Sequence, residues 1–225
     1  MRAEPIVLVH GLGSSFAHGW RASGWADLIA DAGREVIPVD LLGHGTADAP
    51  HDPAEYAHLE SSIERVLPDE PVDAIGFSLG AQLLLRVAAQ APERIGRLVA
   101  IGVGANVLRD DNTNALADAF EQGAEPTNIT ARLFVQLART AGNDPLAIAA
   151  CVRRPREPLT LDELARVSSP TLVIIGDKDF AGPAQPLVEA LPNATLVTLK
   201  DVDHFRTPSE FACIDAALEF VEATI

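Results

Sequence analysis

The sequence predicts an α/β fold in which helices cover both faces of a mostly parallel sheet of about six strands. Six apolar runs of strand length indicate the sheet: residues 5–9, 35–39, 72–76, 97–102, 171–176 and 195–199. The runs are continuous rather than alternating, which is typical of strands that are buried on both faces. Segments with helical patterning lie between the runs, and such alternation produces parallel strands joined by right-handed crossovers.

The helical segments between the strands carry their own start signals. Four of them are predicted in the parts of the chain that alternate regularly with strands: residues 23–33, 52–67, 78–92 and 207–223. In the second, Asp52 and Pro53 begin the helix and Glu55 completes a predicted capping box. In the last, Thr207 and Glu210 have the same spacing and predict a second box.

One interval, residues 103–170, is longer than a single crossover requires. Four helical patterns lie in it, at residues 112–123 (ending at Gly123), 127–142, 144–154 and 160–167. The third starts at Asp144-Pro145. The fourth starts with a predicted capping box from Thr160 to Glu163. We therefore expect a core of residues 1–104 and 169–225 and a small helical lid of residues 105–168. The alternative is a second layer of ordinary crossover helices.

Composition limits the classes of partner. The chain has 225 residues and 48% of them are hydrophobic, which fits one domain with a sizeable core. With 17 basic and 32 acidic residues the net charge is −15, which argues against nucleic-acid binding and, less strongly, against strongly anionic substrates.

The sequence also indicates the cellular compartment and the state of the two cysteines. No apolar run reaches the ~18 residues of a membrane span, and the apolar run near the N-terminus is too short for a signal peptide. Cys151 and Cys213 have no metal-like spacing and are expected to be free buried thiols. A cytoplasmic location is expected.

The stretch "GFSLG", residues 76–80, has the pattern G-x-S-x-G. It directly follows a predicted strand and directly precedes a predicted helix, which is the context of a nucleophile elbow. The turn must be sharp to expose the hydroxyl of Ser78, and Gly76 and Gly80 leave room for the neighbouring backbone. The alternative is a plain strand-to-helix turn with a serine cap.

A serine hydroxyl needs a base within hydrogen-bond reach, and that base needs an orienting group. Of six histidines, His10, His44 and His204 follow strands, at the carboxyl edge where active residues gather. His204 lies just after the last strand. His10 and His44 stand in His-Gly loops, which we expect them to shape by hydrogen bonds to the backbone. No two histidines have a ligand spacing on one element, so no metal site is expected.

The order Ser78, then an aspartate within 177–179, then His204 accompanies several further motifs. They are "VHGLGSS" (9–15), "DLLGHG" (40–45), "GFSLG", "IIGDKD" (174–179) and "DVDHF" (201–205). Together these motifs resemble those of the α/β-hydrolase superfamily, in the same order and over nearly the whole chain.

The resemblance implies roles for particular residues. Family members commonly show G-x-x-D after the strand that precedes the catalytic acid, which points to Asp179 as the acid. Asp177 would then be a turn residue paired with Lys178 or solvent. Asp177 and Asp203 stay as alternatives for the acid. The resemblance also implies an oxyanion hole made by the backbone N–H groups of Leu12 and Leu79. No strand hairpin of the kind many members have precedes the "VHG" strand. The sheet edge there is expected to be covered or paired in a homodimer.

The resemblance implies a hydrolase that cleaves carboxylic esters of small or medium acyl groups and needs no cofactor or metal. Relatives that open epoxides or displace halide use an aspartate at the elbow, so Ser78 argues against both. A thioesterase, an amidase, a C–C bond hydrolase or lyase, or a non-catalytic small-molecule receptor of this fold stays open. Phe77, Phe120 and Phe134 are candidate substrate contacts, although helical spacing of the lid residues also fits packing on the core.

Overall fold

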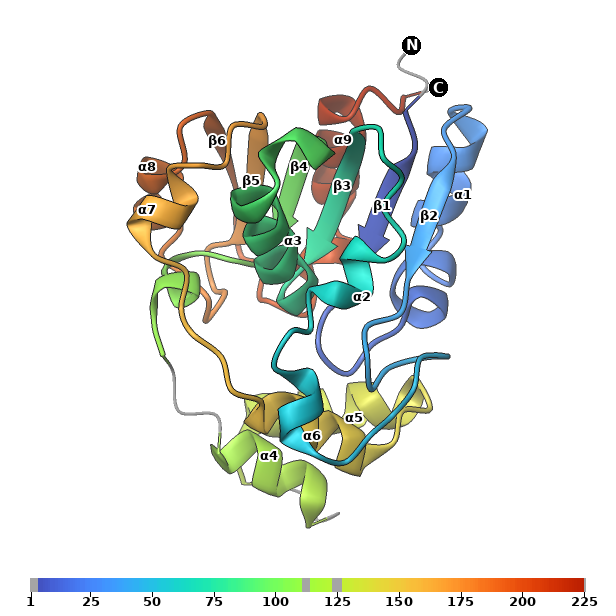
Figure 1. Cartoon of the computed structure of the whole chain (residues 1–225), viewed down its shortest axis with the longest axis vertical. Coiled ribbons are helices and arrows are strands. Elements are labelled where there is room, and N and C mark those ends of the chain that lie inside the picture. The colour runs from blue at the N-terminus through green and yellow to red at the C-terminus, as the bar shows by residue number, and fades with distance from the viewer. Residues whose placement is uncertain (1–3, 111–113, 123–126, 225) are drawn as a thin grey trace.

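The computed structural model describes residues 4–110, 114–122 and 127–224 and builds a six-stranded, all-parallel sheet from them (Figure 1). The strands are β1 (Ile6–Val9), β2 (Val36–Val39), β3 (Val72–Phe77), β4 (Ile95–Ile101), β5 (Thr171–Gly176) and β6 (Ala194–Leu199). Each coincides with a predicted apolar run to within two residues. The fold class predicted from the sequence is confirmed.

The strand order, β2-β1-β3-β4-β5-β6, fixes where a site can form. Val9 at the end of β1 lies opposite Val39 of β2 on one side and Gly76 of β3 on the other. The chain therefore moves outward in opposite directions from β1, and the crevice at the carboxyl ends of β1 and β3 is the topological switch point at which such sheets place ligands. The homodimer predicted from a free sheet edge stays a prediction.

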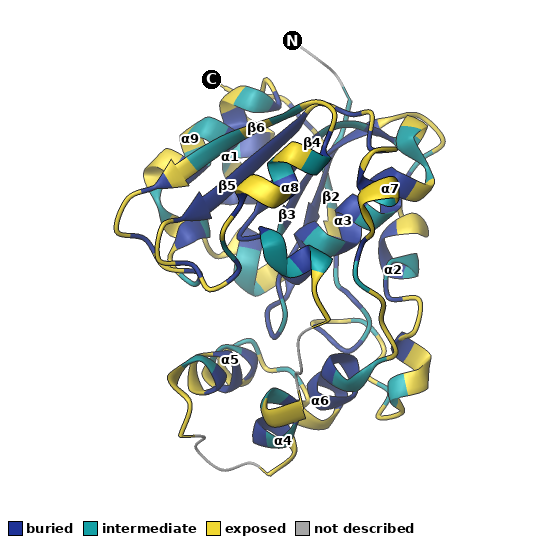
Figure 2. Ribbon diagram, turned by 90° about the vertical axis from the view of Figure 1, so that its left-hand side faces the viewer, coloured by how far each residue is buried: buried dark blue, intermediate teal, exposed yellow. Residues whose placement is uncertain are grey.

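Both faces of the sheet are covered by helices, which explains the continuous apolar strands. On one face lie α1 (Trp25–Asp31) and α9 (Phe211–Phe220). On the other lie α2 (Ser61–Glu64), α3 (Leu79–Gln90), α7 (Leu161–Leu164) and α8 (Gln185–Ala190). All residues of β1 and β5 are buried between these layers, and Figure 2 shows β5 in the dark blue of buried residues.

The predicted helix over 52–67 is wrong in its continuity. A 3₁₀ helix (Pro53–Tyr56) and the separate helix α2 replace it. Asp52 caps the first turn by accepting from the N–H of Ala54, without the predicted box to Glu55. Tyr56 is completely buried, and its hydroxyl donates to the carbonyl of Pro50 (2.7 Å), which holds this turn in place against the core.

The last helix also starts differently from the prediction. Residues Thr207–Ser209 form a 3₁₀ turn and α9 begins at Phe211. The hydroxyl of Thr207 donates backward to the carbonyl of Asp203 (2.8 Å), so the capping box with Glu210 is wrong. The box from Thr160 to Glu163 is present, and Asp144 caps its helix. Helix α8 has no predicted counterpart, because its six residues lack a capping side chain.

Three helices form a separate layer over the carboxyl edge of the sheet (Figure 1). They are α4 (Asn114–Glu121), α5 (Ile129–Thr140) and α6 (Pro145–Arg153), and their apolar faces pack mainly on one another. The predicted end of the first helix at Gly123 lies outside the described residues. Leu159, Leu164 and Val167 belong instead to the main core beside α3. We therefore propose that the lid consists of α4 to α6, a smaller unit than residues 105–168.

No helix in the described ranges combines the length and the apolar character that crossing a membrane requires.

Candidate active site

Ser78 sits on the turn between β3 and α3 with a backbone conformation that is rare for a residue with a side chain, φ +52° and ψ −112°. Two glycines make the turn possible. A Cβ at Gly76 would lie 2.7 Å from the backbone nitrogen of Ala81, and one at Gly80 would lie 2.3 Å from the carbonyl oxygen of Val9. The predicted sharp elbow is therefore present, and it raises the serine hydroxyl at the carboxyl edge of the sheet.

Ser78, His204 and Asp179 form a hydrogen-bonded chain. The Nε2 atom of His204 lies 2.9 Å from the Oγ of Ser78, and its Nδ1 lies 2.9 Å from each carboxylate oxygen of Asp179. All three are buried, with His204 only 2% exposed. A carboxylate only accepts, so Nδ1 carries the proton and Nε2 is left to accept from the serine hydroxyl. This arrangement can move a proton from Ser78 to His204.

The other two aspartates point elsewhere. The carboxylate of Asp177 is exposed, and Lys178 pairs with Asp201 (2.7 Å) instead of with its neighbour. The carboxylate of Asp203 accepts from the backbone N–H of Arg206 (3.1 Å). Of these three candidates, the structure brings Asp179 alone to His204.

Close contact between two loops brings the acid to the base. A Cβ at Gly176 would lie 2.0 Å from the carbonyl oxygen of Val202, so only glycine lets the end of β5 touch the loop that carries His204. The N–H of Ala181 donates to Oδ1 of Asp179 (2.8 Å) and fixes the carboxylate in its turn.

Leu12 and Leu79 lie beside Ser78 in the wall of one cavity. Within the described part of the chain, no backbone carbonyl accepts a hydrogen bond from either backbone N–H group. The loop that carries Leu12 is held by Asn143, whose amide nitrogen donates to the carbonyls of Gly13 (2.8 Å) and Ser14 (3.0 Å). The backbone N–H groups of Leu12 and Leu79 therefore stay the predicted donors to a negatively charged oxygen next to Ser78.

His10 and His44 shape the surrounding loops, as predicted. The N–H of Gly13 donates to Nε2 of His44 (3.0 Å), and the N–H of Leu41 donates to Nε2 of His10 (3.2 Å). Each Nε2 is thus an acceptor, so each Nδ1 carries the proton and donates to a carbonyl, that of Leu42 and that of Gly11 respectively. Both imidazoles are neutral in this network.

The stability of the protein should therefore fall in mild acid. Burial lowers the pKa of His44 from 6.5 to about 3, and repulsion from Arg154, or from His10 when it is protonated, acts in the same direction. Below pH 6.5 the unfolded chain binds a proton that the folded chain does not, so stability is lost as the pH falls. At pH 5 the loss from His44 is about 2 kcal/mol, and it is checked by urea unfolding at pH 7 and pH 5.

The matched variants are His44→Gln, in which this loss should shrink, and His58→Gln, in which it should persist because the side chain of His58 is 87% exposed. An unchanged pH dependence in His44→Gln would contradict the assignment. Burial also lowers the pKa of His10, so a dependence with the same sign remains in every variant.

The cavity at Ser78, about 160 Å³ in volume, has an apolar half and a polar half. The apolar half consists of Leu12, Leu79, Leu116, Phe134, Val152 and Phe180, and the polar half of Gln82, Asn106, Arg109, Arg154 and Arg156.

Of the three predicted substrate contacts, only Phe134 is on this cavity. The ring of Phe77 lies against His204 (5.0 Å between centroids) but does not line the cavity. The prediction for Phe120 is wrong, since its ring is 2% exposed inside the three-helix layer. Phe180 was not predicted as a site residue, but the centroid of its ring lies 4.3 Å from that of His204. It directly follows Asp179, and this adjacency is the sequence feature that could have indicated its role.

Cys151 and Cys213 are free and buried, as predicted. Burial raises the pKa of both thiols, that of Cys213 to about 12, so neither is a ready nucleophile. Among the described residues, no group of three or more His, Cys, Asp or Glu side chains is placed to hold a metal ion.

Comparison with known proteins gives consistent results. A sequence model described as "Alpha/beta hydrolase family" matches residues 6–221. The chain is 29% identical to the pimeloyl-[acyl-carrier protein] methyl ester esterase of Nitrosomonas europaea, over 88% of this chain and 92% of that one. It is also 29% identical to a 2-hydroxymuconate semialdehyde hydrolase of Pseudomonas putida, over 89% and 80%. Among solved structures, an α/β hydrolase from a Medee basin deep-sea metagenome library aligns with a TM-score of 0.80 at 18% identity, over 100% of this chain and 91% of that one.

Proposed function

Because this chain belongs to the alpha/beta hydrolase family, we propose that it is a serine hydrolase that cleaves carboxylic esters of small or medium acyl groups through an acyl-enzyme on Ser78. The observation that carries the proposal is the chain of 2.9 Å contacts from Ser78 through His204 to Asp179. A serine on an elbow with a buried, carboxylate-bound imidazole at its hydroxyl is equipped for nucleophilic attack on a carbonyl.

In the first half-reaction, the Oγ of Ser78 forms a bond to the ester carbonyl carbon while its proton moves to Nε2 of His204. The carbonyl π electrons move to oxygen, and the N–H groups of Leu12 and Leu79 stabilise the resulting oxyanion. One such donor is worth ~3 kcal/mol in the transition state. The carbonyl then re-forms, the bond to the alcohol oxygen breaks, and His204 returns the proton to the departing alcohol.

In the second half-reaction, water attacks the acyl-enzyme. His204 takes a proton from the water as its oxygen bonds to the acyl carbon, and a second oxyanion forms in the same place. Collapse breaks the bond to Ser78, which regains its proton from His204, and the acid is released. Asp179 keeps Nδ1 protonated and balances the positive charge of the imidazolium in both halves.

Other reactions use the same groups. The name of the Nitrosomonas relative supports an ester substrate, while that of the Pseudomonas relative favours C–C bond hydrolysis as the second candidate. A thioesterase or an amidase would use the same residues, with sulfur or nitrogen in place of oxygen as the leaving atom. A non-catalytic receptor is the candidate from another class, since a fold does not fix its function.

The proposal is tested with a panel of chromogenic esters of increasing acyl length and with a serine-directed phosphonate. We expect turnover of the esters, its loss after phosphonate treatment, and a single covalent adduct that maps to Ser78 by mass spectrometry. An adduct together with cleavage of only thioesters, amides or C–C substrates would move the protein to a sister reaction. Neither turnover nor adduct would leave the receptor as the better description.

A further inference from the structure

The polar half of the Ser78 cavity is cationic. Arg109, Arg154 and Arg156 line it together with the amide side chains of Gln82 and Asn106, and no Asp or Glu among the described residues lines it. In the whole chain, 32 acidic residues outnumber 17 basic ones. A wall with three arginines and no described Asp or Glu is therefore the opposite of what this composition favours on average.

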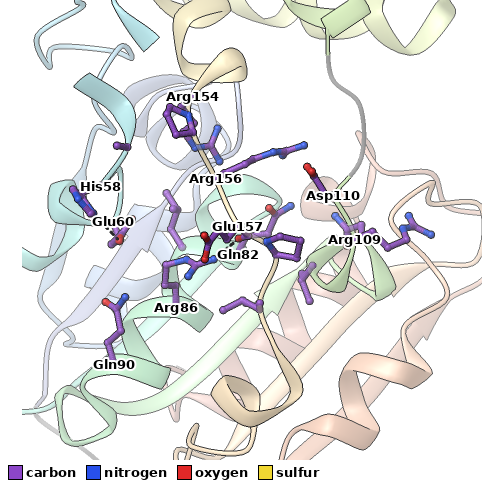
Figure 3. A pocket seen from close by; sticks show the side chains of 17 residues that line it. His58, Glu60, Gln82, Arg86, Gln90, Arg109, Asp110, Arg154, Arg156 and Glu157 are labelled. Atoms are coloured by element: carbon purple, nitrogen blue, oxygen red, sulfur yellow. Dashed lines mark hydrogen bonds and ion pairs between the residues drawn. The ribbon is translucent and has the colours of Figure 1, made fainter. Parts of the chain in front are cut away.

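The arginines come from two segments that face each other. Arg154 and Arg156 follow α6, and Arg109 follows β4 at the end of a short 3₁₀ turn, as Figure 3 shows. An Nη1–H of Arg154 donates to the carbonyl of Cys151 (2.7 Å) at the end of α6, which anchors the guanidinium beside the cavity. The charges of Arg154 and Arg156 both oppose the rise that burial causes in the pKa of Cys151, so both act at this end of the helix.

The same polar side chains also line a second, larger cavity of about 450 Å³, which is drawn in Figure 3. Five residues line both cavities: Gln82, Asn106, Arg109, Arg154 and Arg156. The larger cavity also contains Glu60, Asp110 and Glu157. The excess of positive charge is thus concentrated at the shared wall, close to Ser78.

A fourth arginine, Arg86, lines only the larger cavity. An Nη2–H of Arg86 donates to the carbonyl of Glu157 (2.6 Å), and its Nη1 lies 3.5 Å from the carboxylate of Glu163. Arg86 is therefore part of the scaffold of the larger cavity, and it does not line the Ser78 cavity.

We propose, on the basis of the function proposed above, that the ester cleaved at Ser78 carries a carboxylate, which binds the shared wall at Arg154 and Arg156. Guanidinium groups pair with carboxylates through two parallel hydrogen bonds, and Gln82 and Asn106 supply further amide donors. The apolar part of the substrate lies on Leu116, Phe134 and Val152. The site then takes an amphiphilic monoester with an apolar chain and an anionic end.

The acidic surface does not oppose this assignment. At physiological ionic strength, charges further apart than about 8 Å are largely screened, so a bound carboxylate responds to the arginines beside it more than to the net charge. The sequence-based expectation against strongly anionic substrates rested on the net charge of −15, which averages over this local reversal.

The test compares three esters whose acyl parts all have six carbons. They are methyl hexanoate, monomethyl adipate, which has a carboxylate on its acyl part, and carboxymethyl hexanoate, which has one on its alcohol part. We expect kcat/KM for one of the two anionic esters to exceed that for methyl hexanoate by at least tenfold, with a preference that declines as salt is added. The better of the two identifies which part of the substrate faces the arginines. Equal rates for all three would overturn the anion site and leave the esterase intact.

The variant Arg154→Gln/Arg156→Gln should reduce the preference ratio at least tenfold. Arg139→Gln, on the exposed face of α5 and on neither cavity, is the matched control and should keep the ratio. If the double variant does not fold, Arg156→Gln alone, at an exposed position, should reduce the ratio in the same direction. A ratio that is unchanged in a folded variant would contradict the assignment.

A binding measurement separates failure of the anion site from failure of the esterase proposal. Titration calorimetry should show adipate binding at least tenfold more tightly than neutral adipamide, and Arg156→Gln should weaken the binding of adipate. If no ester is cleaved but adipate binds in this way, the esterase proposal fails and the anion site stands. If adipate and adipamide bind alike, the anion site is wrong.

Discussion

Replacing Ser78 with alanine is expected to lower kcat for ester hydrolysis by a factor on the order of 10⁶. The reason is specific to the geometry. Without the hydroxyl 2.9 Å from His204 there is no oxygen to attack the carbonyl, and the imidazole has no proton to take at the elbow. The rate is measured with a chromogenic ester under saturating conditions. Active-site titration of the variant preparation excludes contamination by wild-type enzyme.

The backbone of the elbow should survive this change. Ser78 already has φ +52°, and the glycines at 76 and 80, which make the turn sterically possible, are unaffected. A melting temperature close to that of the wild type therefore accompanies the loss of activity. Ser209→Ala, at an exposed serine, is the control and should be fully active. Turnover above a few per cent of wild type in Ser78→Ala would mean that His204 activates water directly and that no acyl-enzyme forms.

Steric rules explain why the sheet and the elbow could be predicted from the sequence. Buried parallel strands need continuous apolar runs, and a sharp strand-to-helix turn needs small residues where backbones meet. At Gly80 and Gly176 a single methyl group would come within 2.3 Å and 2.0 Å of carbonyl oxygens. Glycine is therefore required at these positions, and it can be recognised in the sequence. Ser78, Asp179 and His204 follow β3, β5 and β6, whose carboxyl ends lie at the same edge of the parallel sheet.

The shared cationic wall could not be predicted in the same way. Arg154 and Arg156 lie in an irregular segment after α6, where neither helical nor strand periodicity indicates a direction. Arg109 is about 45 residues earlier in the chain, and only tertiary packing brings it to the same cavity. The prediction that Phe120 contacts substrate was wrong for a different reason. Helical spacing shows that one face of a helix is apolar, but it does not show whether that face contacts a substrate or a neighbouring helix.

Asp179→Asn is expected to lower kcat by about 10⁴, with the fold intact. Oδ1 of Asp179 accepts from the N–H of Ala181 (2.8 Å), so the amide oxygen of an asparagine would keep that bond and its NH₂ group would face Nδ1 of His204. An NH₂ group donates, which forces Nδ1 to become the acceptor and moves the imidazole proton to Nε2. His204 would then present an N–H to Ser78 and could not accept its proton, although every heavy atom stayed in place.

The control for this substitution is Asp177→Asn, which makes the same chemical change two residues earlier at an exposed position and should alter kcat less than about twofold. Asp203→Asn tests the second alternative; Asp203 bonds to the N–H of Arg206 instead of to His204, so a small effect is expected there too. All three variants are compared by kcat for one ester and by melting temperature. A loss confined to Asp177→Asn would transfer the orienting role to that residue, and it would mean that the acid turn rearranges when substrate binds. Equal, small effects in all three would show that His204 works without a carboxylate partner, which its 2.9 Å contacts to Asp179 argue against.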